Sequence, residues 1–542
     1  MCKKVFYAIA LLGALSCPAG LVIGGPQHTA AKPGFQTSDR CLACHNGIVT
    51  PSGEDVSIGF AWRSSIMGNS SRDPYWQGSV RRESIDHPES QAAIEDECSI
   101  CHMPITRFEA KVEGRKGQVF SHLPFDQDKK ENAKAEDGVS CSVCHQIANE
   151  KLGTPESFNG GFVVNAPSSS ESGHLEYGPF GIDAGRQHIM HTSSGGFHPT
   201  EGSHIRDSAL CGTCHTLKTR ALGPGGKEIG SFPEQMPYQE WLHSDYPNRS
   251  SSCQSCHMPE IHGQMPITAV LGVPREGARQ HTFVAGNFFM QRMLNLYRRE
   301  LSVAALPTEM TAASERTVAF LQSETARVSI PSVELVSDRL QVRVLVQNLS
   351  GHKMPTAYPS RRAWLHLVVR DARDNKVFES GALKADGSIE GNDNDMDPAR
   401  FAPHYREITS SGEVQIYEPI LKDADGHVTT GLLSAVGYLK DNRLLPSGFK
   451  KETAEQDIAV VGDAAEDPNF TGAGNLVQYS VSTGNASGPF RVQAELWYQP
   501  IGFRWAHNLS RYDAPEPQRF VGYYDSMASA TAVLLARAEA TH

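Results

Sequence analysis

The sequence leaves almost no cysteine for disulfide bonds, and it lacks several motifs common in enzymes. Of its 12 cysteines, all but Cys2 and Cys17 fall in copies of one short motif, so no structural disulfide is expected. No run of 18 apolar residues follows the first 25 positions, which excludes a later transmembrane helix. The sequence has no nucleophile elbow, no phosphate-binding loop and no dinucleotide fingerprint. Hydrolase, nucleotidase and dehydrogenase activities of those kinds are therefore not predicted.

Basic residues are fewer than acidic residues. Lys and Arg number 50 against 61 Asp and Glu, giving a formal net charge of −11. This balance argues against a nucleic-acid partner and suits a soluble carrier protein. A chain of 542 residues is too long for one hydrophobic core, and two or three domains are expected.

The first 25 residues have the pattern of a secretory signal. Lys3 and Lys4 precede an apolar run of about a dozen residues, which is followed by small residues. The run Ala14-Leu15-Ser16-Cys17 leaves open an alternative in which a lipid on Cys17 holds the protein at a membrane. Either way the sequence predicts export beyond the inner membrane of a bacterium, into the periplasm or further.

The dominant feature is a Cys-x-x-Cys-His motif that occurs five times between residues 41 and 257. Two thiols at this spacing form thioethers to one porphyrin, and the following His binds its iron, so each copy is the attachment signature of a c-type haem. Zinc knuckles would need the motifs to pair off, and a thioredoxin-like redox pair would occur once and need no His. Five covalently attached haems are predicted, with iron ligands His45, His102, His145, His215 and His257 and with attachment through Cys41, Cys44, Cys98, Cys101, Cys141, Cys144, Cys211, Cys214, Cys253 and Cys256.

The spacing of the motifs predicts how the haems pack. Residues 41–257 provide about 43 residues for each haem, too few to wrap every porphyrin separately. The haems are therefore expected to pack on one another and to form much of the core. The segments between motifs are rich in Gly, Pro, Ser and Asn, so the predicted haem domain, residues 26–282, is built from short helices and irregular loops.

Histidines are abundant enough to supply sixth iron ligands. Of 22 His, 17 remain after the five motif residues, whereas at most five more ligands are needed. A surface or hydrogen-bonded role is the default for any single His. The candidate sixth ligands are His122, His191, His204, His281 and His352, together with the thioether of Met67, which is equally consistent with a core methionine.

Several blocks around the motifs resemble those of bacterial multihaem cytochromes c. They are the segment 137–147, the segment 210–217 and the two Cys-His-Met-Pro runs that end at Pro104 and Pro259. The group includes the tetrahaem cytochromes that accept electrons from hydroxylamine oxidoreductase. The resemblance covers residues 37–290 and implies bis-histidine haems in alternating parallel and perpendicular pairs. Pentahaem nitrite reductases usually have one motif ending in Lys, and here all five end in His, which argues against that activity.

From about residue 328 the hydrophobic pattern changes to alternation with a period of two. The segments 328–336, 340–347, 364–370 and 490–498 are predicted strands, and together they favour an antiparallel β-sandwich over residues 328–515. A helical connector over 283–327 is expected before it, and a C-terminal helix over 516–542 after it. The acidic loop Asp386–Asp397 is a candidate calcium site, although its spacing is not that of an EF-hand and most acidic loops are simply solvated.

The expected fold class is therefore α+β and multidomain, with a mainly helical and irregular multihaem domain followed by an antiparallel β-sandwich. The first functional hypothesis is an exported pentahaem cytochrome that carries electrons between redox partner proteins. The alternative is an oxidoreductase in which one haem keeps an open position for a small nitrogen or sulfur compound. A third reading makes the β domain a binding module whose partner defines the function. The surplus of histidine favours haems that are all closed.

Overall fold

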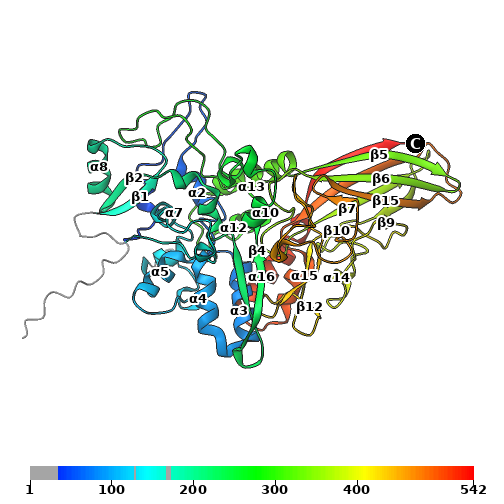
Figure 1. Ribbon diagram of the computed structural model, residues 1–542, viewed down its shortest axis with the longest axis horizontal. Helices are drawn as coiled ribbons and strands as arrows, with labels where there is room; N and C mark the ends of the chain where they lie inside the picture. The colour runs from blue at the N-terminus through cyan, green and yellow to red at the C-terminus, as the bar shows by residue number, and fades with distance from the viewer. Residues whose placement is uncertain (1–33, 127, 129, 166–172) are drawn as a thin grey trace, which may run out of the picture.

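The computed structural model describes residues 34–126, 128, 130–165 and 173–542. The predicted signal segment and Cys17 lie outside these residues. The described chain is elongated: short helices and loops of the N-terminal half occupy one end, and long strands of the C-terminal half occupy the other (Figure 1). The longer helices of both halves meet in the middle.

The N-terminal half is made of short helices because Gly and Pro interrupt the chain at close intervals. Each Cys-x-x-Cys-His motif lies on or at the edge of one of them. The helices are α1 (Asp39–Leu42), α2 (Ile58–Arg63), α3 (Pro74–Asp86), α4 (Gln91–His102), α5 (Pro104–Val112), α6 (Ala133–Glu136), α7 (Cys141–Gln146), α8 (Ala184–Ser194), α9 (Ser208–Gly212), α10 (Pro237–Leu242) and α11 (Cys253–His257).

Two small sheets complete this half. Strands β1 (His174–Gly178) and β2 (Phe197–Glu201) pair in parallel, and α8 connects them. Strands β3 (Leu217–Leu222) and β4 (Glu228–Gln235) form an antiparallel hairpin that projects beside α3 (Figure 1).

Helix α3 links the two halves. Its start is fixed by Asp73, whose side chain accepts hydrogen bonds from the backbone N–H groups of Tyr75 and Trp76. Along its length it packs against a helix near the C-terminus, α16 (Pro515–Ser526). Arg81 of α3 donates two hydrogen bonds to the carboxylate of Glu516, at 2.8 and 2.9 Å. This bidentate pair joins residues that are more than 400 positions apart.

Two helices occupy the predicted connector, α12 (Phe288–Leu296) and α13 (Pro307–Glu324). The side chain of Asn287 caps α12 by accepting from the N–H of Met290. The apolar face of α12, including Phe288, Phe289 and Met293, is fully buried. The connector is therefore part of the core rather than a linker.

The C-terminal half is the predicted antiparallel sandwich, which confirms the α+β fold class. One sheet has the order β10-β7-β16-β17 with β8 beside β7, and the other has the order β14-β15-β6-β5 with β9 beside β15. A third, small sheet has the order β12-β11-β13. The elements of this half are β5 (Ala326–Val336), β6 (Arg339–Asn348), β7 (Arg362–Arg370), β8 (Lys376–Ser380), α14 (Asp393–Met396), β9 (Glu407–Ile408), β10 (Ile416–Tyr417), β11 (Pro419–Lys422), β12 (Val428–Thr429), β13 (Gly437–Asp441), β14 (Phe470–Thr471), β15 (Gly474–Ser482), β16 (Arg491–Gln499), α15 (Phe503–His507), α16 and β17 (Val533–Thr541).

Alternate residues of the strands fill the space between the two large sheets. In β6 these are Leu340, Val342, Val344 and Val346, all fully buried, and the facing sheet contributes Leu365, Leu367 and Val369 of β7. The same hydrophobic cluster continues into α12, α13, α16 and Tyr75 of α3. The connector helices thus share the core of the sandwich, to which the N-terminal half adds Tyr75 and Met236, while other buried residues of that half form smaller clusters.

The predicted C-terminal helix over 516–542 is wrong in its second half. Helix α16 ends at Ser526, and residues 533–541 form β17, which pairs antiparallel with β16. In this segment Ala536, Ala538 and Ala540 alternate with polar residues. Short apolar residues at a period of two complete a sheet edge when a long neighbouring strand is available, and this tertiary pairing overrides the helix propensity of alanine.

The acidic loop 386–397 is organised by protein groups. Asp395 accepts a hydrogen bond from Arg362 at 2.7 Å and a second from the N–H of Ile389, and its pair with Arg362 is buried. Asp393 pairs instead with Arg400. Because these carboxylates are directed to separate partners, the loop gives no support to the calcium prediction.

A charged ladder crosses four strands of one sheet. His366 of β7 lies between the carboxylates of Glu379 on β8, at 3.1 Å, and Glu495 on β16, at 3.2 Å, and Glu495 also binds Arg537 of β17. The hydrogen bond from His366, opposed by burial, lowers the pKa of Glu495 to about 2. Burial alone would lower the pKa of His366, but the two carboxylates raise it.

These shifts predict a stability maximum in mildly acidic solution. The lowered pKa of Glu495 gives stability that is lost as pH falls from about 4.5 towards 2, and the raised pKa of His366 gives stability that is lost as pH rises through that pKa. We expect H366Q to lower stability by about 1–2 kcal/mol at pH 5.5 and much less at pH 8.5. Thermal unfolding at both pH values checks this, with H427Q as control because the His427 side chain is 78% exposed. Equal losses at both pH values would contradict the ladder.

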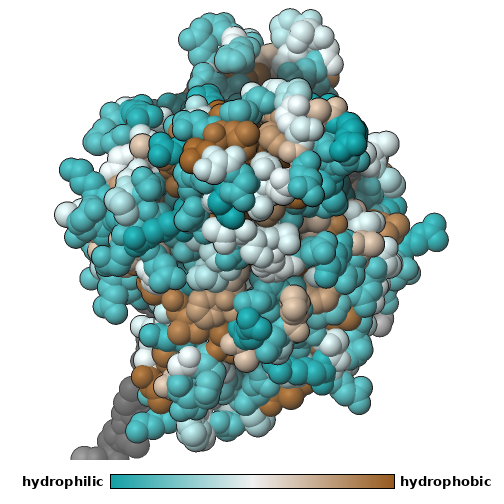
Figure 2. Space-filling view, turned by 90° about the vertical axis from the view of Figure 1, so that its right-hand side faces the viewer, coloured by the Kyte–Doolittle hydropathy of each residue, from teal (hydrophilic) through white to brown (hydrophobic). Residues whose placement is uncertain are grey.

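No helix in the described part of the chain is long and apolar enough to cross a membrane. The far end of the β half is mainly hydrophilic, with scattered hydrophobic patches (Figure 2). Exposed apolar residues of the β half include Leu335, Val336 and Met396. They are too few to mark a large apolar docking surface at these positions.

Candidate haem-binding site

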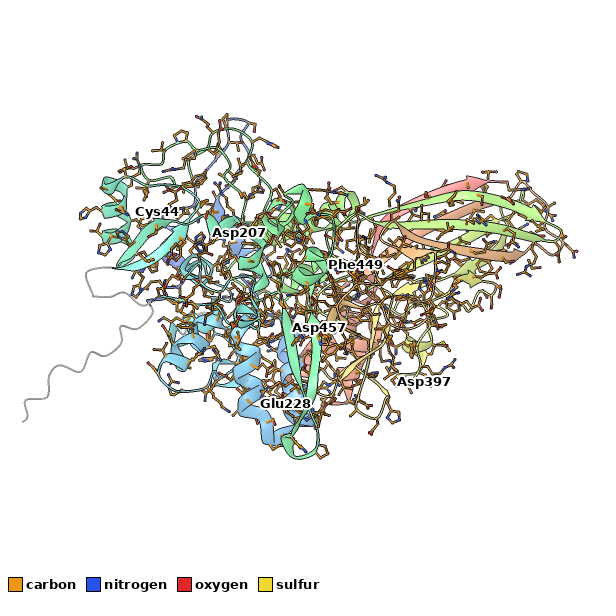
Figure 3. All side chains as sticks on the ribbon, viewed as in Figure 1. Cys44, Asp207, Glu228, Asp397, Phe449 and Asp457 are labelled. Atoms are coloured by element: carbon orange, nitrogen blue, oxygen red, sulfur yellow. The ribbon has the colours of Figure 1, made fainter. Side chains whose placement is uncertain are left out.

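All five motifs open onto one internal cavity of about 1690 Å³. Its wall includes each of the ten motif cysteines and each of the five motif histidines. A site for one drug-sized molecule has roughly 300–1000 Å³, so this cavity suits several large groups. Cys44 lies in the helical end of the molecule, whereas Phe449 lies at the junction with the β half (Figure 3).

Four of the five motif histidines are oriented by the backbone in the same way. The Nδ1 atoms of His45, His102, His145 and His257 lie 2.5–2.8 Å from the carbonyl oxygens of Ile267, Ser70, Tyr177 and Val284, respectively. Each carbonyl fixes the proton on Nδ1 and leaves Nε2 as the free base. Metal-binding histidines have this arrangement.

Burial keeps the motif imidazoles neutral. It lowers the pKa of His102 and of His215 to about 4, and lowers those of the other three as well. A neutral imidazole has a free lone pair at pH 7, which is the form that binds iron.

Two further histidines face motif histidines across the cavity. The rings of His145 and His281 are 6.3 Å apart, centre to centre, with 17° between their planes. The rings of His257 and His352 are 6.2 Å apart, with 7° between their planes. A metal–imidazole bond is about 2 Å and the nitrogen lies about 1 Å from its ring centre, so two imidazoles on one metal stand about 6 Å apart. Each pair is therefore spaced for one iron between its rings.

The two facing histidines come from different parts of the fold. His281 follows the last motif, and its Nδ1 lies 3.1 Å from the carbonyl of Arg279. His352 lies in the loop after β6, and its Nδ1 lies 2.9 Å from the carbonyl of Lys353. Burial lowers the pKa of His281 to about 3 and that of His352 to about 4. The β half thus contributes a side chain to the haem cavity.

A buried ion-pair network holds the loop of His352. Lys353 is fully buried and donates to Asp441 at 2.7 Å, and Asp441 also binds Arg443. The N–H of Lys353 donates to Glu240 of α10, which completes the network. Because α10 lies between the fourth and fifth motifs in the chain, these contacts tie the loop to the haem half.

Replacing Lys353 should therefore disturb one haem specifically. We expect K353M to cost about 3–5 kcal/mol of stability, since a buried charge loses its partner, and to weaken the low-spin signal of the haem at His257. Electron paramagnetic resonance of the oxidised protein is the measurement. K440M is the matched control, because Lys440 forms a buried pair with Glu418. An unchanged spectrum in K353M, or the same spectral change in both variants, would contradict this role.

Three predicted ligands lie away from the cavity. His204 is buried, and its Nε2 is 2.9 Å from the carbonyl of Ile147. The Nδ1 of His122 is 2.9 Å from the side-chain oxygen of Asn132. His191 lies on α8, with its Nδ1 buried and without a hydrogen-bond partner. None of the three lines the cavity, so the structure does not bring them to a motif histidine.

Met67 does line the cavity. It belongs to a turn whose Ser70 carbonyl contacts Nδ1 of His102, and its own carbonyl accepts from the N–H of Val139. Its role as a ligand stays a prediction.

Thiol contacts show which motifs are neighbours. A hydrogen bond links Cys41 to Cys141 and lowers the pKa of Cys41. Equivalent bonds raise the pKa of Cys211, through Cys253, and of Cys214, through Cys101. The fourth motif therefore touches both the second and the fifth, and the first touches the third.

Other polar groups in the wall fit a bound haem. The side-chain oxygens of Gln254 and Gln291 are buried, face the cavity and have no hydrogen-bond partner. Arg361 also lines the cavity. Burial is the main cause of the lowered pKa values of His257 and His352, and the positive charge of Arg361 lowers them further. The Arg361 cation suits the carboxylates that every haem carries, whereas an amide oxygen can accept a hydrogen bond only from a protonated carboxyl group. The residues present thus fit covalently bound haem.

A group that sequence reasoning missed surrounds the second motif. Trp76 of α3 stacks on His102, with ring centres 4.3 Å apart and planes 3° apart. The same helix face adds Tyr75, Ser79 and Glu83 to the cavity wall. Their spacing of four residues places them on one side of α3, but nothing in that pattern indicates that the side faces a haem.

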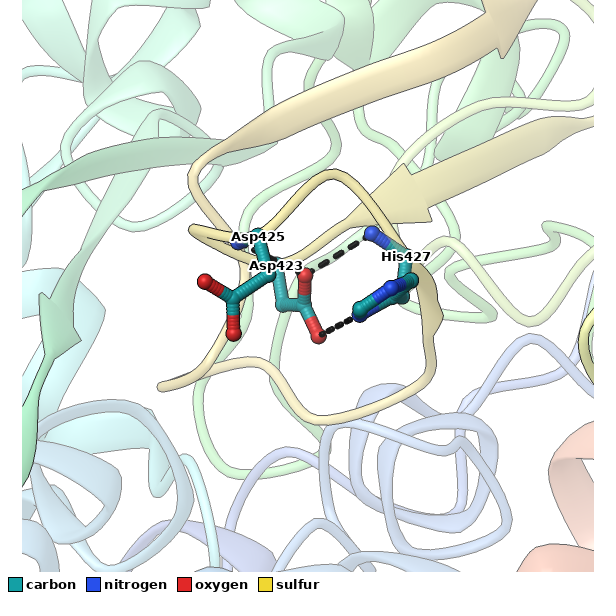
Figure 4. A group of neighbouring side chains, drawn as sticks. All are labelled: Asp423, Asp425 and His427. Carbon is teal, nitrogen blue, oxygen red and sulfur yellow. Dashed lines mark hydrogen bonds and ion pairs between the residues drawn. The ribbon is translucent and has the colours of Figure 1, made fainter.

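Among the residues that the structure describes, one group of carboxylate and imidazole side chains outside the cavity could contact a cation. Asp423, Asp425 and His427 meet in the turn between β11 and β12 (Figure 4). Asp423 already accepts backbone hydrogen bonds from Asp425 and His427, which is the usual way an aspartate stabilises a turn. The group is mostly exposed, and turn formation accounts for it.

The fold resembles a solved structure, the crystal structure of a penta-heme cytochrome c552 from Thermochromatium tepidum. The TM-score is 0.51 at 15% sequence identity, and the match covers 94% of this chain and 99% of that chain. No protein-family model and no curated protein sequence matches the chain. At this level of identity the likeness shows a shared fold. It does not bear on the resemblance to the electron acceptors of hydroxylamine oxidoreductase.

Proposed function

We propose that the protein is an exported pentahaem c-type cytochrome that carries electrons through closely packed haems. The observation that carries this proposal is the single cavity onto which five haem-attachment motifs open, with thiols of neighbouring motifs in contact. Attached haems would then lie edge to edge or face to face. Bound haem supplies a reversible one-electron couple at each site.

The chain itself would set the properties of each site. The ten motif cysteines would hold the haems, and the five motif histidines would bind iron, with backbone carbonyls fixing four of their rings. His281 and His352 would close the haems at His145 and His257, because their rings stand at the distance that one iron requires. Burial in a wall of low polarity would keep water from these metals and tune their potentials.

The thiol contacts support an order of haems. The fourth site would connect to the second and the fifth, and the first would pair with the third. Electrostatic contact of Cys144 with Cys214 and Cys211 would join the two groups through the fourth site. The fourth haem would then be the branch point of the electron path. The partners at its ends would be redox proteins, and export would follow from the N-terminal signal, with membrane attachment through Cys17 as a further possibility.

Two measurements test the proposed function. Haem content per chain should be five by spectroscopic assay and by the mass of the purified protein. After rapid mixing with a small reductant, all five haems should be reduced. Their kinetic phases should be coupled, because electrons exchange rapidly between neighbouring haems. Fewer than five haems, or haems reduced independently of one another, would overturn the proposal.

A further inference from the structure

One motif histidine has a tryptophan stacked on the face of its ring. The rings of Trp76 and His102 are 4.3 Å apart, centre to centre, and their planes differ by 3°. Trp76 is 9% exposed, and both side chains line the cavity. In the described part of the chain, no other motif histidine has a tryptophan, tyrosine or phenylalanine stacked parallel to it. This contact therefore distinguishes the second motif.

The edge of the same imidazole is held as well. Its Nδ1 lies 2.8 Å from the carbonyl oxygen of Ser70, and the hydroxyl of Ser70 donates to the carbonyl of His102 at 3.1 Å. The hydrogen bond at the ring edge fixes the tautomer, whereas the stacked indole opposes rotation of the ring about the bond that joins it to the side chain. The two contacts together determine the orientation of the imidazole.

Ser70 and Trp76 belong to one continuous hydrogen-bonded segment. Asp73 accepts from the N–H groups of Tyr75 and Trp76 and so fixes the first turn of α3. The side chain of Gln77 donates back to the carbonyl of residue 71 at 2.8 Å. Helix α3 also packs against α16 (Figure 1). The carbonyl and the indole thus reach the imidazole from a single unit, which is anchored on the C-terminal half.

Packing alone does not account for this arrangement. Trp76 belongs to a small hydrophobic cluster with Val80, Ile94 and Met103, and burial of an indole needs only such apolar neighbours. The parallel contact in addition places the indole against the face of a polar ring. Aromatic rings that meet in parallel with an offset attract each other beyond the effect of buried area. The indole therefore both shields one face of the imidazole and holds its plane.

We propose that Trp76 is a positioning residue for the haem of the second motif: it fixes the angle of the His102 imidazole about its bond to iron and keeps water from one face of that ring. This inference deepens the proposed function and rests on haem attachment at Cys98 and Cys101. The plane of an axial imidazole decides which iron orbital its π electrons reach, and the apolar shell around a ligand tunes the potential of the metal. Loss of the indole should change one haem without removing its ligand.

The test replaces the indole and leaves the ligand in place. We expect W76L and W76I to broaden the ferric electron paramagnetic resonance signal of one haem, because the imidazole then takes a range of angles. They should also lower the potential of that haem, because water near the ligand favours the more highly charged ferric state. Its electron-exchange equilibrium with a neighbouring haem should shift by about two- to tenfold, the range to which a stacked aromatic pair corresponds. W76F keeps an aromatic face and should retain most of the native signal and potential.

Two further variants assign the signal to the second motif. H102M keeps both attachment cysteines and should change the same signal as W76L does. W241L is the matched control, because Trp241 also lines the cavity but donates its indole N–H to the carbonyl of Ser251 at 2.9 Å and stacks on Tyr238. We expect W241L to leave the signal of the second haem unchanged. Redox titration of the same samples gives the potentials.

Haem content per chain distinguishes the possible results. Fewer than five haems on the native chain would overturn the proposed function. With five haems attached, an unchanged second signal in W76L and W76I, or a signal altered as strongly in W76F as in W76L, would overturn only the inference. Loss of haem from both W76L and W76I would also overturn it, because Trp76 would then be needed for the site to form and not for the orientation of its ligand.

Discussion

Without attached haem, the chain is expected not to fold. The motifs surround about 1690 Å³ that the protein cannot fill. Without porphyrin the apolar groups that line this space would face water, and the burial lost over such an area is comparable with the 5–15 kcal/mol by which proteins are usually stable. Expression of the mature chain in the cytoplasm, where haem is not attached to these cysteines, should give a product without cooperative unfolding. Circular dichroism during thermal melting is the measurement.

The strand content of the β half gives the more specific readout in this experiment. Its strands share one hydrophobic cluster with α3, α12 and α13, so we expect it to lose its structure together with the haem half. The haem-loaded protein from an exporting strain is the control. A haem-free chain that melts cooperatively with the strand content of the native protein would show that the sandwich folds by itself, contrary to this expectation.

Removal of a facing histidine is expected to have the second largest effect. H281A and H352A should each convert one low-spin haem to high spin, because each removes one imidazole of a pair spaced for a shared iron. The corresponding Met variants should stay low-spin and raise one reduction potential by on the order of 0.1 V, within the roughly 0.8 V that axial ligands span. Electron paramagnetic resonance and redox titration are the measurements.

Matched controls for these variants come from histidines that do not line the cavity. H122A and H204A remove imidazoles that contact Asn132 and the carbonyl of Ile147. We expect H204A to lower stability, because His204 is buried, and neither variant to change any haem signal. A change of spin state in H204A with unchanged signals in H281A would reverse the assignment of ligands.

The sequence predicted the parts of the architecture in which apolar side chains recur at a fixed interval. Alternation with a period of two predicted the strands of the sandwich. The composition between the motifs predicted short helices and loops, and the motif spacing predicted that the haems pack on one another. Alanine alternating with polar residues over 536–541 is compatible with either a helix or an edge strand. Only the neighbouring strand β16 decides between them, which is why the last element was predicted as a helix.

The candidate iron ligands show a different limit of prediction from sequence. His281 and His352 were predicted from their places in the chain, after the last motif and in the loop that follows a strand, and each faces a motif histidine in the fold. The density of histidines between 174 and 204 predicted His191 and His204, which lie outside the cavity wall. Density does not determine where a ring points, because a backbone carbonyl can bind the imidazole as readily as a metal can.

The position of His352 has a consequence for how the molecule is made. If the chain is exported as proposed, the five attachment motifs emerge from the exporting machinery first, and the residue proposed to complete the fifth site follows almost 100 residues after His257. Haem ligation at that site would therefore be a checkpoint on synthesis of the C-terminal half. A nascent or truncated chain that ends before β6 would carry all five attachment motifs and still hold an incomplete fifth centre. Maturation of the proposed electron carrier would thus end with tertiary folding and not with the covalent chemistry of its cysteines.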